Sequence, residues 1–234
     1  MELFDVKGKV VVVTGAGRGI GEATADLFAS RGSTVARLDV EPGDRITPVD
    51  VTDESAVNAA FQKIGKIDIL VNNAGIAVRK NSFDITREEW DRVIAVNQTG
   101  LFLCSRAAAR SMRQTGGGAI VNLASIMGYS GGLFPNPAYQ ASKGAVVNLT
   151  RALALEFAEF NIRVNAVAPT YVRTDLTVPI FSSPEMMKTV MAHTPLGRFP
   201  EPEEIAAAIV YLCSPEANCV TGIVLPVDSG YLAR

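Results

Sequence analysis

The sequence is poor in the residues that build metal sites and disulfides: it has one histidine and three cysteines in 234 residues. His193 has no cysteine or carboxylate neighbours at ligand spacing, so we expect no metal site. Cys104, Cys213 and Cys219 form no CxxC pair and are odd in number, which favours free thiols in a reducing, cytoplasmic compartment.

Long apolar runs and a strong charge of one sign are also missing. The formal net charge is -2 and no basic stretch occurs, so nothing favours nucleic acid or an anionic membrane surface as a partner. The apolar run 10–13 is far too short to span a bilayer, and no other stretch approaches the needed length. Because a core-like strand begins at Val10, we expect no cleavable signal peptide before it. The expected partner is a small-molecule substrate.

Apolar runs of strand length alternate with segments of helical period along the whole chain. Strands that are β-branched and apolar on both faces indicate a parallel sheet covered by helices on both sides. No linker or repeat divides the chain, so we predict one α/β domain over 1–234, a doubly wound parallel sheet of Rossmann-like type. The expected strands are 10–13, 34–38, 46–49, 69–71, 119–123, 163–167 and 223–227, and the expected helices are 20–31, 54–64, 87–96, 99–113, 139–160 and 203–212.

Two connections stand out from this alternation. Only ten residues separate Asp39 from Asp50, too few for a crossover helix, so we expect a loop between the second and third strands. The stretch 175–200 carries four prolines and breaks the pattern, and we predict that it is a substrate lid. A plain surface excursion is the alternative.

A glycine-rich turn, TGAGRGIG over 14–21, follows the first strand and opens the first helix. Gly15 and Gly19 leave space for a pyrophosphate, and the free N–H groups of the helix start favour an anion there. Asp39 lies 24 residues after Gly15, where a carboxylate would bind the adenosine ribose of NAD and repel the 2′-phosphate of NADP. Arg18 could meet that phosphate, so NADP stays possible.

Tyr139 and Lys143 are four residues apart and therefore share one face of a predicted helix. A free tyrosine has a pKa of about 10, and a nearby ammonium would lower it toward the range of useful proton transfer. Ser125, which follows a strand, could hydrogen-bond a substrate oxygen as charge develops on it. Taken singly, Tyr139 could be a surface tyrosine, Lys143 a solvated charge, Ser125 a turn former and Asn97 a helix N-cap.

Taken together, the motifs resemble those of the short-chain dehydrogenase/reductase family, in the branch with chains of about this length. They occur in the expected order along nearly the whole chain: the turn 14–21, Asn72-Asn73-Ala74-Gly75, Asn97 between Val96 and Gln98, Ser125, and Tyr139-Gln140-Ala141-Ser142-Lys143. The resemblance implies a catalytic set of Asn97, Ser125, Tyr139 and Lys143.

The same resemblance implies roles for individual residues. Asn97 would distort its helix, and its carbonyl would hold a water linked to Lys143. Lys143 would also bind the nicotinamide ribose. Thr14 would brace the loop of Asn73 and Gly75. The residues expected to bind the cofactor are Gly15, Arg18, Gly19, Ile20, Asp39, Asp50, Val51, Asn73, Gly75, Tyr139, Lys143, Val172 and Thr174.

One departure concerns the substrate pocket. The family usually has Pro-Gly after its sixth strand, whereas this chain has Pro169-Thr170, and threonine does not adopt positive φ cheaply. We expect pocket walls from 126–128, 134–137, Thr170-Tyr171 and the lid. The stretch 136–143 and the segment 225–231 resemble those of sugar, sugar-acid or polyol dehydrogenases of the family. Members of the family are usually homotetramers, so the resemblance also implies a homotetramer. The alternatives are a 3-oxoacyl thioester reductase that uses NADPH, and a Rossmann protein that senses NAD(H) without catalysis.

Overall fold

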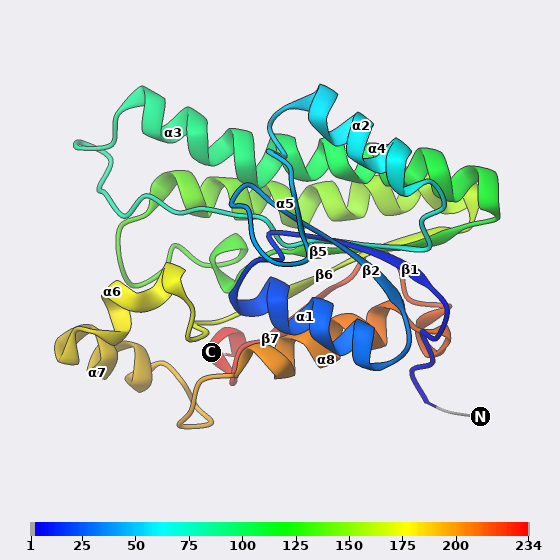
Figure 1. The fold of residues 1–234 in the computed structure, drawn as a ribbon. Helices are drawn as coiled ribbons and strands as arrows, with labels where there is room; N and C mark the ends of the chain where they lie inside the picture. The colour runs from blue at the N-terminus through cyan, green and yellow to red at the C-terminus, as the bar shows by residue number, and fades with distance from the viewer. Residues whose placement is uncertain (1–2, 234) are drawn as a thin grey trace.

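The computed structural model describes residues 3–233, which form a parallel sheet with helices on both faces (Figure 1). The strands lie in the order β3-β2-β1-β4-β5-β6-β7, and every pair is parallel. This order confirms the predicted doubly wound α/β fold, with the reversal between β1 and β4. The strands are β1 (Val10–Thr14), β2 (Thr34–Asp39), β3 (Ile46–Pro48), β4 (Ile69–Asn72), β5 (Gly118–Leu123), β6 (Ile162–Pro169) and β7 (Val224–Val227).

Helices α1 (Gly19–Ser30) and α8 (Pro202–Cys213) cover one face of the sheet, and α2 (Glu54–Ile64), α4 (Leu101–Thr115) and α5 (Pro137–Phe157) cover the other (Figure 1). Successive residues of a strand point to opposite faces. Val12 accordingly packs in the core under α2, α4 and α5, whereas Val11 and Val13 pack under α1 and α8. Apolar residues on both sides of each strand are thus buried, as the two-sided pattern predicts.

The segment 40–45 joins β2 to β3 without a helix, so the expectation drawn from the short spacing is confirmed. Helix α2 begins where Asp53 accepts hydrogen bonds from the N–H groups of Ser55 and Ala56, and it ends at Gly65, whose φ is +79°. An aspartate N-cap is a usual local signal for the start of a helix, and a glycine of positive φ is a usual signal for its end.

The prediction of two separate helices over 87–96 and 99–113 is wrong. Helix α3 (Arg87–Ile94) runs through a π-helical turn, η1 (Ala95–Gly100), directly into α4. The buried Asn97 side chain exchanges hydrogen bonds with the backbone of Ile76 and also donates to Ser142 Oγ. These contacts come from distant segments, so the helical period alone could not show that the helix continues through a widened turn.

The stretch 175–200 is also more regular than expected. It contains η4 (Asp175–Thr177), α6 (Val178–Phe181) and α7 (Pro184–Ala192), beside the carboxyl edge of the sheet (Figure 1). Pro179 and Pro184 occupy first-turn positions of α6 and α7, where the missing N–H has no partner to lose. Ile180 and Val190 pack with Tyr171 in a small core.

The chain therefore forms short helices at prolines that suggested irregular structure.

Among residues 3–233, no helix is long and apolar enough to cross a bilayer.

Candidate active site

A cavity of about 810 Å³ opens at the carboxyl ends of the parallel strands. Its walls come from segments that follow β1, β2, β4, β5 and β6, so it spans the point where the strand order reverses. Open α/β sheets bind ligands at such a point, and the volume is ordinary for a ligand site. All thirteen residues predicted to bind the cofactor line the cavity, and so does Ser125.

The glycine turn between β1 and α1 is shaped to admit an anion. Gly19 has a φ of +57°, a conformation that glycine adopts without strain. A Cβ on Gly21 would lie 2.0 Å from the carbonyl oxygen of Gly15, so no larger residue fits there. In the described part of the chain, the N-cap residue Arg18 makes no side-chain cap bond, so the first N–H groups of α1 remain available to a phosphate. These features fit the pyrophosphate of a dinucleotide.

The loop after β4 is tied to this turn. The Thr14 hydroxyl accepts hydrogen bonds from the N–H groups of Asn73 and Ala74, each at 3.1 Å. The Asn73 amide donates to the carbonyl oxygens of Thr14 at 3.1 Å and Gly15 at 2.7 Å. The expected bracing by Thr14 is therefore confirmed, and Asn73 adds to it from the other side.

Asp39 ends β2 beside the glycine turn. Its Oδ2 accepts a hydrogen bond from the Gly17 N–H at 2.9 Å, and its Oδ1 accepts one from the Glu41 N–H at 3.2 Å. The carboxylate is thereby held in place at one end of the cavity. Arg18 pairs with Asp175 at 3.1 Å, but both side chains are about 70% exposed, and such pairs contribute about 0–1 kcal/mol. Arg18 is therefore free to change partners.

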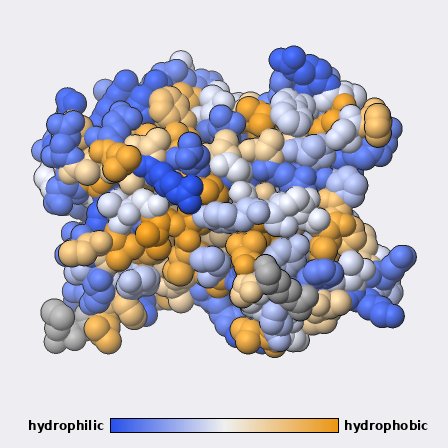
Figure 2. All heavy atoms as spheres, turned by 180° about the vertical axis from the view of Figure 1, so that it is seen from behind, coloured by the Kyte–Doolittle hydropathy of each residue, from blue (hydrophilic) through white to orange (hydrophobic). Residues whose placement is uncertain are grey.

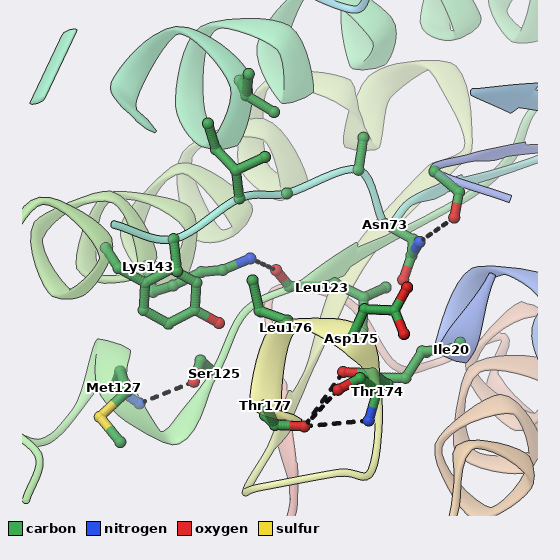
Figure 3. A pocket seen from close by; sticks show the side chains of 18 of the residues that line it. Ile20, Asn73, Leu123, Ser125, Met127, Lys143, Thr174, Asp175, Leu176 and Thr177 are labelled. Atoms are coloured by element: carbon green, nitrogen blue, oxygen red, sulfur yellow. Dashed lines mark hydrogen bonds between the residues drawn. The ribbon is translucent and has the colours of Figure 1, made fainter. Parts of the chain in front are cut away.

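Ser125, Tyr139 and Lys143 come together at the other end of the cavity. Ser125 caps the short helix η2 (Ile126–Gly128), where its hydroxyl accepts the Met127 N–H at 3.1 Å. Lys143 Nζ lies 5.5 Å from the centre of the Tyr139 ring and donates to the Leu123 carbonyl oxygen at 2.5 Å (Figure 3). The arrangement brings together three of the four residues of the predicted catalytic set.

The electrostatics at this end differ from expectation. Burial raises the pKa of Tyr139 above its ordinary value, while a hydrogen bond with Ser125 and the charge of Arg79 act in the lowering direction. Burial lowers the pKa of Lys143 to about 8. The expected lowering of the pKa of Tyr139 by Lys143 is therefore not found: the net shift is upward, and the groups that oppose it are Ser125 and Arg79.

Arg79 is a residue that the sequence analysis missed. It lines the cavity from the segment after β4, and its charge opposes the rise in the pKa of both Tyr139 and Tyr171. The only sequence signal for Arg79 is its position, four residues after the Asn72–Gly75 motif that follows a strand. Its position in the cavity depends on the path of the following loop, which local patterns do not predict.

Asn97 lies behind the cavity wall and is 1% exposed. Its amide donates to the Ile76 carbonyl at 2.9 Å and to Ser142 Oγ at 3.0 Å, while its Oδ1 accepts the Ile76 N–H at 2.8 Å. A Cβ on Gly75 would lie 3.4 Å from that oxygen and 3.8 Å from Lys143 Nζ, so these three residues adjoin. The π-helical turn shows the expected distortion, and the water relay stays a prediction.

The segment that leads into the stretch 175–200 contacts the glycine turn. The Thr174 methyl group would be 3.0 Å from a Cβ on Gly19, so the two segments approach closely. The Thr177 hydroxyl, which the sequence analysis missed, accepts the Thr174 N–H at 3.1 Å and donates to the Val172 carbonyl at 2.5 Å. In Figure 3, Leu176 points into the space between Ser125 and the region of Asn73. Thr177 thus orders the turn that carries Val172 and Thr174.

The predicted pocket walls are partly confirmed. Most of the expected positions outside the stretch 175–200 line the cavity, with Gly128 and Pro137 as the exceptions, whereas within that stretch only Asp175, Leu176, Thr177 and Ile180 do. Thr170 lies outside the left-handed region, so this turn does not need the family's usual glycine. The expected wall residues that line the cavity are Ile126, Met127, Phe134, Pro135, Asn136, Thr170, Tyr171, Asp175, Leu176, Thr177 and Ile180.

Comparisons with known proteins extend over the whole chain. A family model described as enoyl-(acyl carrier protein) reductase matches residues 15–232. A galactitol 2-dehydrogenase (L-tagatose-forming) from Cereibacter sphaeroides is 43% identical, over 98% of this chain and 97% of the relative. A 3-oxoacyl-(acyl-carrier-protein) reductase from Thermotoga maritima is 39% identical, over 96% of this chain and 98% of the relative.

A crystal structure with bound NADP, named for a 2-deoxy-D-gluconate 3-dehydrogenase from Agrobacterium tumefaciens, has the same fold. Its TM-score is 0.95 at 35% identity, and the match covers 100% of both chains.

Proposed function

The chain belongs to the short-chain dehydrogenase/reductase family and acts on CH–OH groups, and we propose that it transfers hydride between NAD(H) and the carbinol or ketone carbon of a sugar, sugar acid or polyol. One observation carries the proposal: a single cavity has Ser125, Tyr139 and Lys143 at one end and the held carboxylate of Asp39 at the other. The similarity to galactitol and deoxygluconate dehydrogenases supports the substrate class.

A bound nicotinamide would supply the hydride donor in reduction and the hydride acceptor in oxidation. The Ser125 hydroxyl would hydrogen-bond the substrate oxygen. In reduction, Tyr139 would give its phenolic proton to that oxygen; in oxidation, the phenolate would take the hydroxyl proton. Because burial raises the pKa of Tyr139, the phenol is protonated at neutral pH, and alcohol oxidation should accelerate as the pH rises.

NAD is the proposed cofactor because Asp39 occupies the position that would face the adenosine ribose. A carboxylate there accepts the 2′-hydroxyl and disfavours a 2′-phosphate. Asp50 and Val51, which line the cavity nearby, are the proposed contacts of the adenine ring. The structural neighbour with bound NADP keeps NADP as the alternative, with Arg18 as the residue that would meet its phosphate.

A second candidate is a 3-oxoacyl thioester reductase that uses NADPH. The 39% identity to the Thermotoga maritima reductase favours it, whereas Asp39 disfavours its usual cofactor. A non-catalytic NAD(H) sensor is disfavoured because such a protein has no need of a serine, a tyrosine and a lysine at one end of the cavity.

A substrate panel with both cofactors tests the proposal. We expect NAD-dependent oxidation of alcohols among galactitol, D-glucitol, D-gluconate and D-galactonate, with little activity on acetoacetyl-coenzyme A and NADPH. Turnover of the thioester with NADPH alone would show that the second candidate is correct. No turnover of any substrate, together with tight NAD(H) binding, would favour the sensor.

We also propose a homotetramer. Ala107, Ala108 and Ala109 are buried within the subunit, but Leu155 on α5 is 83% exposed and Phe102 on α4 is 36% exposed. The opposite view of the molecule shows apolar side chains across the middle of its surface (Figure 2). Light scattering should give four times the mass of the chain; a monomer would contradict this part of the proposal.

The thiols of all three cysteines are unpaired, which supports a location in the cytoplasm.

A further inference from the structure

We propose that Arg79 binds a carboxylate of the substrate, so that the enzyme acts on hydroxy acids of the sugar-acid class in preference to neutral polyols. This inference rests on the proposed function and narrows its substrate class. It concerns the end of the cavity that holds Tyr139 and Ser125.

Arg79 is a half-buried cation that faces the cavity. Within residues 3–233, no carboxylate lies within ion-pair distance of its guanidinium. Burial lowers its pKa, and the groups that act in the opposite direction are the phenols of Tyr139 and Tyr171. Buried charges in proteins are normally paired, so a guanidinium left in this state is suited to an anion from outside the chain.

The charges around the cavity are unevenly placed. Among the described residues that line it, the acidic ones are Asp39, Asp50 and Asp175. Asp39 lies at the glycine turn, and Asp175 pairs with Arg18 and lies toward Asn73 rather than Ser125 (Figure 3). An anionic substrate therefore meets cations at the reacting end of the cavity and avoids the carboxylates of the cofactor end.

Two polar atoms indicate what the rest of the substrate offers. Thr170 and Asn136 line the same cavity, and the Thr170 hydroxyl and Asn136 Oδ1 are buried without a hydrogen-bond partner among residues 3–233. Thr170 is only 8% exposed, and an unmet polar group at that depth is costly. Both atoms would be satisfied by substrate hydroxyl groups. A carboxylate together with several hydroxyls describes a sugar acid.

Arg79 also connects substrate binding to the proton-transfer residue. Its charge lowers the pKa of Tyr139 against the effect of burial. Removing the charge should therefore raise the pKa of the phenol, and the rising limb of the pH profile for oxidation should move to higher pH. A residue with a merely structural role would not produce this shift.

The test compares acids with the polyols of the same carbon skeleton: D-gluconate with D-glucitol, and D-galactonate with galactitol. For the wild type with NAD, we expect kcat/KM for the acids to exceed that for the polyols by at least about tenfold. Arg79→Gln should lower kcat/KM for the acids by roughly 10–100-fold, mainly through KM, the usual scale of a hydrogen bond to a charged group. The loss for polyols should be smaller, because only the shift of the pH profile affects them.

Two further variants serve as controls. Arg79→Lys keeps the charge and should therefore lose less than Arg79→Gln toward the acids. It should still lose some activity relative to the wild type, because a lysine cannot make a bidentate contact. Lys80→Gln removes one positive charge from the adjacent position, where the ammonium pairs with Glu89 outside the cavity, and should leave both substrates unaffected. Thermal unfolding would show whether each variant is folded.

The outcomes separate this inference from the proposed function. Faster oxidation of polyols than of acids, or equal losses for both in Arg79→Gln, would overturn the role of Arg79 and leave the proposed function standing. Turnover of the thioester alone would overturn the proposed function. A binding experiment covers the case in which neither acid nor polyol reacts, or in which Arg79→Gln does not fold. D-gluconate is titrated into the NADH complex of the wild type and into the NADH complex of Arg79→Lys. The inference requires binding by the wild type and weaker binding by the variant, and the absence of binding overturns it.

Discussion

Replacing Asp39 with asparagine should move the preference of the enzyme from NAD toward NADP. The substitution keeps the size of the side chain and an oxygen that can still accept the Gly17 N–H, now 2.9 Å from Oδ2. What is lost is the negative charge at the position that would face the adenosine ribose. Arg18, whose exposed pair with Asp175 contributes little, is then free to meet a 2′-phosphate.

The expected size follows from two effects. A hydrogen bond to a carboxylate is worth about 1.5–3 kcal/mol, so kcat/KM for NAD should fall by roughly 10–100-fold. Two unit charges about 4 Å apart repel by about 1 kcal/mol in water and about 4 kcal/mol near a protein surface, and NADP should gain a similar amount. The ratio of the two kcat/KM values should therefore change by roughly 100-fold or more.

The assay is initial-rate kinetics with both cofactors on one substrate, accompanied by titrations of NADH and NADPH. Asp50→Asn is the matched control, because Asp50 also lines the cavity but its Oδ1 accepts from Thr52. We expect this control to change the ratio far less. An unchanged ratio in Asp39→Asn, with the protein folded, would refute the assignment of Asp39 as the residue that selects the cofactor.

Two other perturbations test the site more locally. Gly21→Ala places a Cβ 2.0 Å from the Gly15 carbonyl oxygen and should lower Tm by roughly 5–10 °C. In the control Gly131→Ala the added Cβ meets nothing within 4 Å, so Tm should change little. Equal changes in Tm, measured by calorimetry, would count against a tightly packed turn. Burial lowers the pKa of Lys143 from 10.5 to about 8, so the folded state binds fewer protons between these values and its free energy of unfolding should rise with pH there. In denaturant unfolding, the free energy of unfolding of the wild type should increase relative to that of Lys143→Met by up to about 3 kcal/mol from pH 8 to pH 10.5. The exposed Lys188→Met is the control. A difference between wild type and Lys143→Met that does not change with pH would contradict a buried, desolvated amine.

The parts of the site that the sequence predicted well depend on short spacings. The turn 14–21 needs glycine for steric reasons, and the four-residue separation of Tyr139 and Lys143 places both on one helix face whatever surrounds them. The helix-free connection between β2 and β3 followed from the short segment between Asp39 and Asp50. Each of these inferences needs only local geometry.

The parts that the sequence did not predict depend on contacts between distant segments. The π-helical turn exists where Asn97 bonds the backbone of Ile76, 21 positions earlier. Arg79 reaches the cavity because of the path of the loop after β4. The pKa of Tyr139 is raised by burial and lowered by Ser125 and Arg79, which come from two distant segments, so the spacing to one lysine could not predict the net direction. Pro179 and Pro184 in the stretch 175–200 lie in the first turns of helices, and a rule that treats proline as a helix breaker cannot distinguish such positions from a loop.

The most direct test of the account is the Tyr139→Phe variant, which removes the phenolic oxygen and keeps the ring. Steady-state turnover of the best substrate and fluorescence titration of NADH should be measured on the same preparation. We expect turnover to fall by roughly 100–10,000-fold, the usual effect of losing a general acid–base group, while the dissociation constant of NADH changes by less than about threefold. Turnover near the wild-type level with intact NADH binding would contradict Tyr139 as the proton-transfer residue.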